Sequence, residues 1–251
     1  MKTIIEHNNN SFVLDLNKPL DISIPIKSDG VCAWGVDPLK IEAHQDGSWI
    51  GDVRKGSAVN FNNINFNPHA HCTHTECFGH ISPKKESINK QIKHFFFIAK
   101  LITVTPKKKH PDCVITKNMI ESVFTNSENV DALIIRTLPN NNKENKNYSN
   151  SNHPYLMKPA IDYIVEKRIK HILIDLPSID KEKDEGKLIA HKAFWQFPNA
   201  IRKSCTITEL IYVPNVVSDG TYLLNLQFVP FENDASPSRP VLFKLNKIKD
   251  E

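Results

Sequence analysis

Two apolar runs with one helical segment between them constrain the fold of this chain more than any other feature. The runs are DALIIRT, residues 131–137, and HILIDLP, residues 171–177, and both are typical of buried strands. The segment YLMKPAIDYIVEKRI, residues 155–169, lies between them and predicts a helix. A strand, a helix and a strand in this spacing form a βαβ unit, whose two strands pair in parallel.

Further strand-length runs lie on both sides of this unit. Helices are predicted at TKNMIESVF (116–124), with Thr116 as the N-cap, and at LIAHKAFWQF (188–197). The other predicted strands are SFVLDL (11–16), ISIPI (22–26), HFFFIAKLITV (94–104), TITELIYV (206–213), TYLLNLQFV (221–229) and PVLFKL (240–245). The order is β-rich, then α/β, then β-rich. We therefore predict a mixed α/β fold in a single domain over residues 1–251.

The polar and basic stretches of the chain indicate solvated loops. The tract NNNKENKNYSNSN, residues 140–152, is low in complexity and predicts a mobile surface loop. The lysine run at residues 107–109 is interpreted in the same way. The net charge is only +4, and no basic stripe interleaved with aromatic residues accompanies it, so we do not expect a nucleic-acid partner.

The apolar stretches and the cysteines indicate the cellular compartment expected for this chain. The longest apolar run, FFFIA at residues 95–99, is far too short to span a bilayer, so no membrane is expected as a partner. No secretory signal is visible in MKTIIEHNNNSF at the N-terminus. The five cysteines have no regular disulfide spacing. A reducing cytoplasm is the simplest setting for them.

One loop-like segment, NPHAHCTHTECFGHI at residues 67–81, is unusually rich in metal-type ligands. It holds four histidines and a glutamate, the residue types that bind zinc and related transition metals. His74 and Glu76 are two positions apart, so in an extended segment they point to the same face. His80 shares that parity if the strand continues past Phe78 and Gly79.

The spacing leaves two points open. Either His69 or His71 is placed to complete the site from the preceding turn. A structural zinc site using Cys72 and Cys77 is the alternative, but structural zinc sites usually draw on two cysteine pairs, and no second pair exists here. We therefore favour a catalytic site of histidine and carboxylate over a structural one.

The segment THTECFGH resembles the H-x-G-T-H-x-D-x-P-x-H signature of the cyclase-like metal-dependent hydrolases, which include kynurenine formamidase and isatin hydrolase. The resemblance covers most of the chain, because six further blocks follow the family's order. These blocks are LDLNKPLDISIPI, LIIRT, LIDLPSID, AHKAFW, ITELIYVPN and SPSRPV.

The resemblance implies a set of site residues. The second histidine of the signature corresponds to His74, its bridging aspartate to Glu76, and its acid/base histidine to His80. The later ligand blocks place a histidine at His191 and a glutamate at Glu209. The first histidine of the signature falls at Ala70, which is a departure, and His69 and His71 flank that position. We favour His69, because the nearer branch of the family has its histidine there.

The resemblance also implies a fold, a cofactor and an activity. The fold is the swivelling β/β/α cyclase-like fold with mixed sheets, usually in a homo-oligomer, here a dimer or tetramer. The cofactor is one or two divalent ions, Zn²⁺ or Mn²⁺. A divalent ion polarises a carbonyl and lowers the pKa of bound water to roughly 7, which suits hydrolysis of an amide.

Three functions follow as hypotheses. The leading one is an arylformamidase-like hydrolase that cleaves a C–N amide bond of a small molecule, with His80 transferring the proton. A lyase or dehydratase on the same scaffold is the alternative. A non-catalytic metal or ligand binder is the third. Trp34 has two interpretations, stacking on an aromatic substrate or packing in the core.

Overall fold

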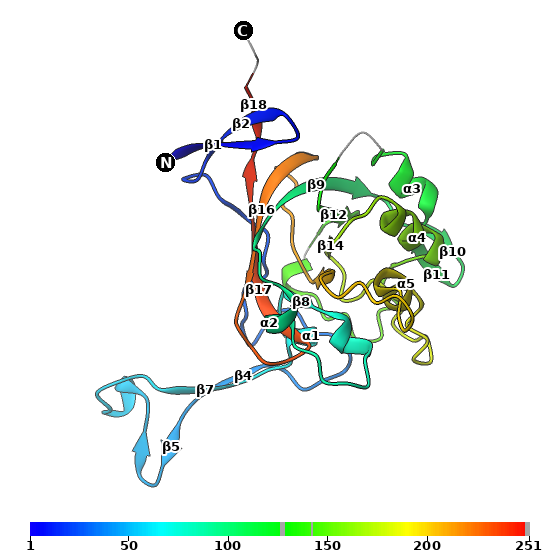
Figure 1. The fold of residues 1–251 in the computed structure, drawn as a ribbon. Helices are drawn as coiled ribbons and strands as arrows, with labels where there is room; N and C mark the ends of the chain where they lie inside the picture. The colour runs from blue at the N-terminus through cyan, green and yellow to red at the C-terminus, as the bar shows by residue number, and fades with distance from the viewer. Residues whose placement is uncertain (126–128, 142, 249–251) are drawn as a thin grey trace.

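The computed structural model describes residues 1–125, 129–141 and 143–248 (Figure 1). At its centre the predicted βαβ unit is present. Strands β12 (Ala132–Thr137) and β14 (His171–Ile174) pair in parallel, and helix α4 (Lys158–Glu166) lies between them in the chain. The prediction from the two apolar runs is therefore confirmed.

The main sheet closes on itself. Its strand order is β16-β9-β12-β14-β15-β8-β17-β3, and β16 also pairs with β17, so seven of the eight strands form a ring. A closed ring leaves no free strand edge among these seven. The strands not yet bounded are β3 (Leu20–Asp21), β8 (His74–Glu76), β9 (Phe96–Val104), β15 (Thr206–Glu209), β16 (Gly220–Phe228) and β17 (Ala235–Lys244).

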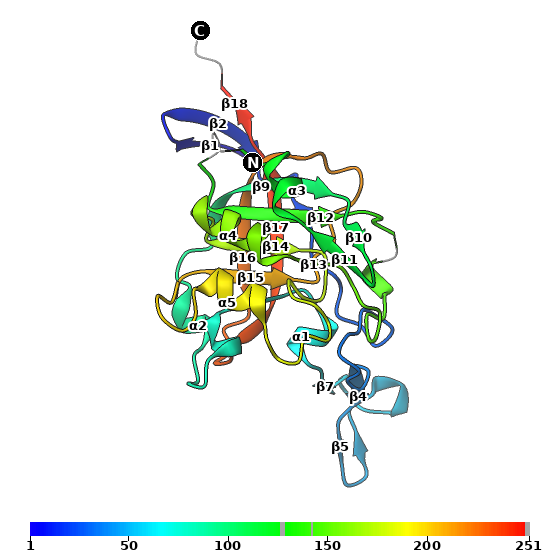
Figure 2. The same cartoon turned by 90° about the vertical axis from the view of Figure 1, so that its right-hand side faces the viewer.

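The two faces of this ring carry different cores. Leu133 and Ile172 lie on the outer face, in one apolar cluster with residues of the helices. Ile134 and Leu173 alternate with them and belong to a second cluster on the inner face. Figures 1 and 2 show helices α3 (Lys117–Glu121), α4 and α5 (Ile189–Trp195) outside the ring, on the side of β12 and β14.

The helices are short. They are α1 (Pro68–His71), α2 (Ile88–Gln91), α3 (Lys117–Glu121), α4 and α5 (Ile189–Trp195), with 3-10 turns η1 (Val53–Lys55), η2 (Phe78–Ile81) and η3 (Lys143–Asn145). The predicted helices at residues 116–124, 155–169 and 188–197 correspond to α3, α4 and α5, each with narrower bounds. Within the described part of the chain, no helix combines the length and the apolar composition that crossing a bilayer requires.

Smaller sheets extend from the ring. One consists of β1 (Lys2–His7), β2 (Asn10–Asp15) and β18 (Asn246–Lys247), which brings the two ends of the chain together. Another consists of β10 (Lys107–Lys109), β11 (Asp112–Ile115) and β13 (Tyr155–Leu156). The lysine run that we interpreted as a loop is thus an edge strand, and its three lysines are all exposed, as is common for edges.

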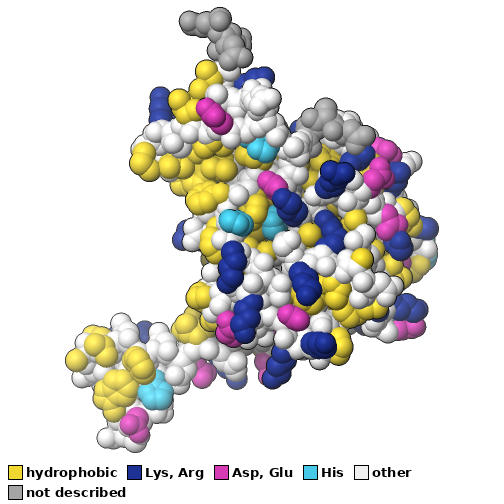
Figure 3. Space-filling view, in the orientation of Figure 1, with side chains coloured by type: hydrophobic (Ala, Val, Ile, Leu, Met, Phe, Trp, Pro, Cys, Tyr) yellow, Lys and Arg dark blue, Asp and Glu magenta, His cyan; other side chains and the backbone are white. Residues whose placement is uncertain are grey.

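An arm of residues 40–65 projects away from the body of the molecule (Figure 1). Its stem is a two-stranded ribbon of β4 (Lys40–Ala43) and β7 (Asn62–Asn65), and its end carries the hairpin of β5 (Gln45–Asp46) and β6 (Trp49–Ile50). Figure 3 shows hydrophobic side chains gathered at the end of the arm. The exposed apolar residues of the arm are Ile41, Trp49, Val53, Val59, Phe61 and Ile64.

Two sequence predictions are corrected here. Residues 22–26 form no strand, because pairing stops at Asp21, whose carboxylate accepts hydrogen bonds from the backbone and side chain of Ser23. The tract at residues 140–152 is not simply a surface loop, although its residue 142 lies outside the described residues. Lys143 and Tyr148 within it are buried. The lysine is held by hydrogen bonds to Thr137 and Asp175, which satisfy its charge.

A buried histidine in β14 makes stability depend on pH. Burial lowers the pKa of His171 from 6.5 to about 3, and its ring packs 4.1 Å from that of Phe97. Between these two values the unfolded chain binds a proton that the folded chain does not. The contribution of neutral His171 to the free energy of unfolding is therefore fully present above pH 6.5. It falls by about 1.4 kcal/mol per pH unit as the pH decreases toward 3.

We predict that His171→Asn removes this part of the pH dependence. Between pH 7 and pH 5, the free energy of unfolding of the wild type should fall by about 2 kcal/mol more than that of the variant. Urea unfolding at both pH values measures the difference. His94→Asn, at an exposed histidine, is the control and should behave as the wild type does. Equal losses in wild type and His171→Asn would contradict the prediction.

Candidate metal centre

Strand β8 presents two of the predicted site residues. His74 and Glu76 point to the same face of the sheet, and both are fully buried. Across the antiparallel pairing with β15, Glu209 lies directly opposite His74. The Nε2 atom of His74 is 3.6 Å from Oε2 of Glu209. Three predicted ligands thus meet on the outer face of the ring.

Helix α1 brings His69 to this group. The side chain of Asn67 caps the helix by accepting a hydrogen bond from the backbone N–H of His69. The Nδ1 atom of His69 is 3.3 Å from Oε2 of Glu76. His71 instead accepts a hydrogen bond at Nδ1 from the backbone N–H of Asn67 and belongs to none of the ligand clusters among the described residues. The structure therefore places His69, and not His71, beside His74 and Glu76.

Helix α5 brings His191 from the other side. Its Nε2 atom is 3.0 Å from Oε1 of Glu76 and 3.8 Å from Oε1 of Glu209. Asp180 fixes the ring, because its carboxylate lies 2.6 Å from Nδ1 of His191. The same carboxylate accepts the backbone N–H groups of Ala190 and His191, so it also caps the start of the helix.

The turn η2 carries His80. Strand β8 ends at Glu76, and the 3-10 turn of residues 78–81 directs His80 back toward it. Its Nδ1 atom is 3.2 Å from Oδ2 of Asp234 and 3.7 Å from Oε2 of Glu76. The strand does not persist to His80, yet the turn still brings this residue to the cluster. Its side chain is 30% exposed, in contrast to the buried His74.

Three histidines share one arrangement. Each has one ring nitrogen anchored outside the cluster and the other turned toward Glu76 or Glu209. The anchors are Asp234 for His69, the carbonyl of Cys72 for His74, and Asp180 for His191. Metal-binding histidines in proteins are usually held in this way, which fixes the tautomer and the ring orientation. Asp180 and Asp234 were not singled out in the sequence, although Asp180 ends the LIDLPSID block.

The electrostatics of the cluster favour ionised carboxylates. Burial raises the pKa of Glu76, but the charge of His80 and a hydrogen bond from His191 outweigh this and hold it well below its ordinary value. Burial lowers the pKa of His69, yet its hydrogen bond to Asp234 and the neighbouring carboxylate of Glu76 raise it to about 10. The pKa of His191 is raised well above 6.5 despite burial, through hydrogen bonds to Asp180 and Glu76.

The residues present fit a divalent metal. The Nε2 atom of His74 and the Oε2 atom of Glu76 are buried with no hydrogen-bond partner, although buried polar atoms are normally paired. Ligand atoms of His69, His74 and Glu76 lie within 4.8 Å of one another, and so do those of Glu76, His80 and His191. Imidazole and carboxylate together are a donor set that suits zinc and manganese.

The cysteines of the motif do not join this donor set. Cys72 and Cys77 are fully buried, and neither belongs to a ligand cluster in the described part of the chain. Burial raises the pKa of each thiol to about 12. A neutral thiol is a poor metal ligand, so this favours the histidine and carboxylate site over the structural zinc alternative.

Trp34 contacts the backbone of the helix that carries His69. The indole Nε1 of Trp34 donates a hydrogen bond to the carbonyl of His69, and the indole lies edge-on to the ring of His153. Trp34 is 38% exposed, so it is not a core residue. His153 is buried, and its Nε2 atom has no partner. Core packing of Trp34 is therefore excluded, and its stacking on an aromatic substrate stays a prediction.

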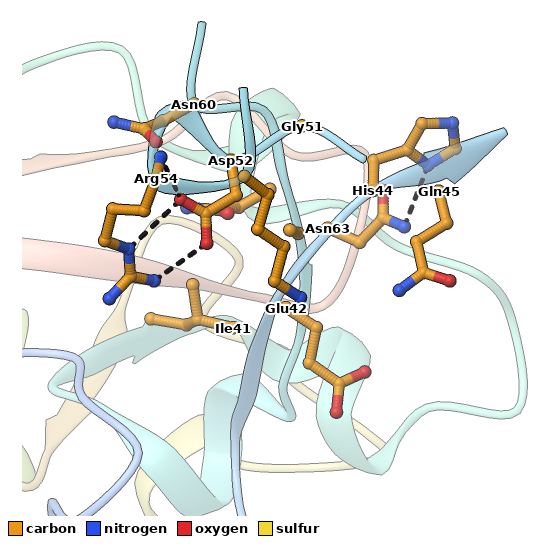
Figure 4. Close-up of a pocket in the computed structure, with 12 residues that line it drawn as sticks. Ile41, Glu42, His44, Gln45, Gly51, Asp52, Arg54, Asn60 and Asn63 are labelled. Carbon is orange, nitrogen blue, oxygen red and sulfur yellow. Dashed lines mark hydrogen bonds and ion pairs between the residues drawn. The ribbon is translucent and has the colours of Figure 1, made fainter. Parts of the chain in front are cut away.

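A depression on the arm is unrelated to this cluster. It has a volume of about 990 Å³ and is lined by residues 41–63, including the Asp52–Arg54 ion pair and the contact between His44 and Asn63 (Figure 4). All of its lining comes from the arm, and none of the predicted site residues contributes to it. Size alone therefore does not identify the functional site of this molecule.

Comparison with known proteins supports the resemblance seen in the sequence. A family model described as putative cyclase matches residues 20–181, which is well over half of the 251 residues. The matched stretch contains the histidine-rich motif, whereas His191 and Glu209 lie beyond it. No curated protein sequence matches the chain.

Solved structures resemble the chain over nearly its whole length. A potential metal-dependent hydrolase with cyclase activity has 19% identity and a TM-score of 0.65, covering 90% of this chain and 97% of its own. A predicted metal-dependent hydrolase from Bacillus stearothermophilus has 20% identity and a TM-score of 0.62, covering 90% and 98%. Isatin hydrolase A from Labrenzia aggregata has 12% identity and a TM-score of 0.60, covering 90% and 93%. At these identities the likeness establishes the cyclase-like fold that we predicted.

We predict that His74→Ala abolishes metal binding while His71→Ala does not. His74 offers its unpartnered Nε2 to the cluster, whereas His71 lies outside it. After zinc or manganese loading and desalting, elemental analysis should find at least about tenfold less metal in His74→Ala than in the wild type. His71→Ala, the matched control from the same motif, should keep the wild-type content. Full retention of metal by His74→Ala would refute the assignment.

Proposed function

The chain belongs to the cyclase family, and we propose that it acts within that family as a metal-dependent hydrolase of small amides. The observation that carries this proposal is the convergence of His69, His74, His191, Glu76 and Glu209 with two buried ligand atoms left unpartnered. Such a set is costly to bury without a cation among its members.

The five converging residues would hold one or two divalent ions, zinc or manganese. Glu76 is central, because its two oxygens face different histidines: Oε2 lies near His69 and Oε1 near His191. A carboxylate whose two oxygens face different histidines could contribute one oxygen to a cation on each side. When bound, the ion supplies Lewis acidity, polarising a carbonyl and making water a nucleophile near neutral pH.

The protein's own residues would then complete hydrolysis of a C–N bond. The leaving nitrogen requires a proton, and His80 is the histidine of the cluster with the greatest solvent exposure among those in contact with Glu76. Its Nδ1 atom faces Asp234, so the opposite edge of the ring is turned away from that anchor. Histidine gives and takes protons near neutral pH, which suits this role.

The substrate class that we propose is an arylformamide or cyclic amide. One similar structure is an isatin hydrolase bound to the product analogue thioisatinate, which supports a cyclic aryl amide. The exposed indole of Trp34 beside His69 supports an aromatic ring in the substrate. We also propose a reducing cytoplasm as the site of action, because the five irregularly spaced cysteines suit it.

The two other hypotheses predict different products. A lyase or dehydratase on this scaffold would leave a C=C bond, whereas hydrolysis adds water across a C–N bond. A non-catalytic binder would hold metal and turn nothing over. This third hypothesis would be favoured if Glu76, in place of aspartate, or the departure at Ala70 had spoiled the site. His69 weakens the argument from Ala70, because it lies 3.3 Å from Glu76 despite the shift of one position.

We predict that the metal-loaded protein hydrolyses at least one member of a panel of N-formyl arylamines, cyclic imides and lactams. His80→Ala should keep its metal and its melting temperature but lose on the order of 10²–10⁴-fold in kcat, the usual contribution of general acid–base catalysis. Mass spectrometry of the products shows which compounds are hydrolysed, and steady-state kinetics gives kcat. Elemental analysis and thermal unfolding check the metal content and the melting temperature of His80→Ala.

The controls for this experiment separate the hypotheses. Products with a new C=C bond would support the lyase, and metal binding without turnover of any compound would support the non-catalytic binder. Activity of His80→Ala within a few-fold of the wild type would show that His80 is not the proton-transfer residue. The His74→Ala protein, which lacks a buried ligand, sets the background rate.

We further propose that the chain forms a homo-oligomer, a dimer or tetramer, through its arm. An isolated two-stranded ribbon is marginally stable in water, and the stem of the arm has no sheet beyond β4 and β7. Ile41 and Ile64 face each other across this ribbon, and both are exposed. A second copy of the chain would bury these residues together with Trp49 and Phe61.

We predict that Ile64→Asp dissociates this oligomer. A charge at the centre of an apolar interface typically costs about 2 kcal/mol or more, which weakens association at least about 30-fold. Sedimentation velocity over a range of concentrations measures the change. Val216→Asp, at a loop residue that is 91% exposed, is the control and should assemble as the wild type does. A monomeric wild type, or an unchanged Ile64→Asp oligomer, would exclude the arm as the interface.

A further inference from the structure

One carboxylate oxygen contacts two histidines of the site at once. Oδ2 of Asp234 is 3.0 Å from Nε2 of His69 and 3.2 Å from Nδ1 of His80. The two rings lie close together, with 4.4 Å between their centroids. One of these histidines is the proposed ligand of α1, and the other is the proposed proton-transfer residue. Among the described residues, Glu76 also lies near both rings, but Asp234 is the one that hydrogen-bonds to both.

The position of Asp234 is set by the main sheet. It directly precedes β17, whose first residue, Ala235, pairs with Glu76. The carbonyl of Asp234 accepts a hydrogen bond from the backbone N–H of Cys77. These contacts tie Asp234 to the corner where β8 ends and η2 begins. A carboxylate mounted on rigid backbone holds its partners more precisely than one on a free loop.

We infer that Asp234 is a positioning residue that sets the tautomers of His69 and His80 together. The inference rests on the proposed function. An ionised carboxylate only accepts hydrogen bonds, so both ring nitrogens that face it carry protons. With an ion bound, His69 would then be protonated at Nε2, which faces Asp234, and its Nδ1 lone pair would be available to the ion beside Glu76. His80 is protonated at Nδ1 and presents the lone pair of Nε2 for proton exchange.

A carboxyl group is ordinarily ionised near neutral pH, so Asp234 can accept a hydrogen bond from each of the two rings. Ligation of a second ion by Asp234, His69 and His80 is the competing interpretation, because their ligand atoms also lie within 4.8 Å of one another.

The test compares Asp234→Asn, Asp234→Glu and the control Glu232→Gln. Asparagine keeps the shape of the side chain but can present an N–H group to either ring, whereas glutamate keeps an acceptor. Glu232 lies two residues away, is exposed, and bonds to Asn89 and Lys90 instead of to the site. Calorimetric titration of zinc into each metal-free protein gives affinity and stoichiometry, and thermal unfolding shows that each variant is folded.

We expect Asp234→Asn to weaken zinc binding about 10- to 100-fold with the number of ions unchanged. At saturating zinc, its kcat should still fall at least about tenfold, because His80 remains misoriented. Asp234→Glu should recover part of both losses, and Glu232→Gln should match the wild type. In the His80→Ala background, Asp234→Asn should cost no further kcat.

Several results would overturn the inference. Loss of one whole ion in Asp234→Asn would make Asp234 a ligand. Full additivity of Asp234→Asn with His80→Ala would show that Asp234 does not act through His80. Unchanged affinity and kcat in Asp234→Asn would show that it acts through neither histidine.

A failure of the proposed function is distinguishable from these results. If the wild type hydrolyses none of the panel, the ring tautomers remain measurable by long-range ¹H–¹⁵N correlation spectra of the zinc-loaded protein. Those spectra should show a proton on Nδ1 of His80 in the wild type and a change of tautomer in Asp234→Asn. The same tautomer in both proteins would overturn the inference whatever the activity.

Discussion

The pairing of His74–Glu76 with a strand on each side is the interaction on which the rest of the structure depends. Strand β8 pairs with β15 at one edge and with β17 at the other, and so completes the ring. Because side chains alternate along a strand, the same pairing sends His74 and Glu76 to one face and Thr75 to the other, where it bonds to Thr208. A slip of one residue would exchange the faces and remove both candidate ligands. The same strand pairings therefore close the ring and bring the site residues together.

The second constraint is electrostatic. Glu76, Glu209 and His191 are withdrawn from water, and such burial is tolerated only when every group is paired. Asp180 pairs with His191, and Asp234 pairs with the partly buried His69, so the second ring nitrogen of each histidine is turned inward. In an ion-pair network that only stabilises the fold, the nitrogen and oxygen atoms that face its centre would also be hydrogen-bonded. The atoms that stay unpartnered point to a cation as the missing member, which is why the donor set argues for a metal centre and not for a structural ion-pair network.

Much of the fold was predictable, because apolar runs report burial directly, as for β12 and β14. His74 and Glu76 were also predictable, because they belong to one short contiguous motif. The choice between His69 and His71 was not predictable from spacing, because it depends on how Asn67 caps a four-residue helix. The anchoring aspartates were missed for two reasons. Asp234 reaches His69 only through the pairing of strands that lie far apart in the sequence, and Asp180 reaches His191 through a loop whose path the local pattern does not predict. The burial of Lys143 in a polar tract likewise depends on an acidic partner, Asp175, which follows β14 and lies 32 residues away in the sequence.

The closed ring also dictates when the site can exist during synthesis. His69 and Asp234 are 165 residues apart, and β8 needs β17 before it has both of its neighbours. At 5–20 residues per second, a ribosome takes roughly 10 to 30 s to make the chain between them. Throughout that interval the histidine-rich segment lacks β17, the strand that pairs with β8. Non-local pairing of this kind also folds slowly. The complete set of contacts around His69 can therefore form only after β17 has been made, long after the histidine-rich segment itself.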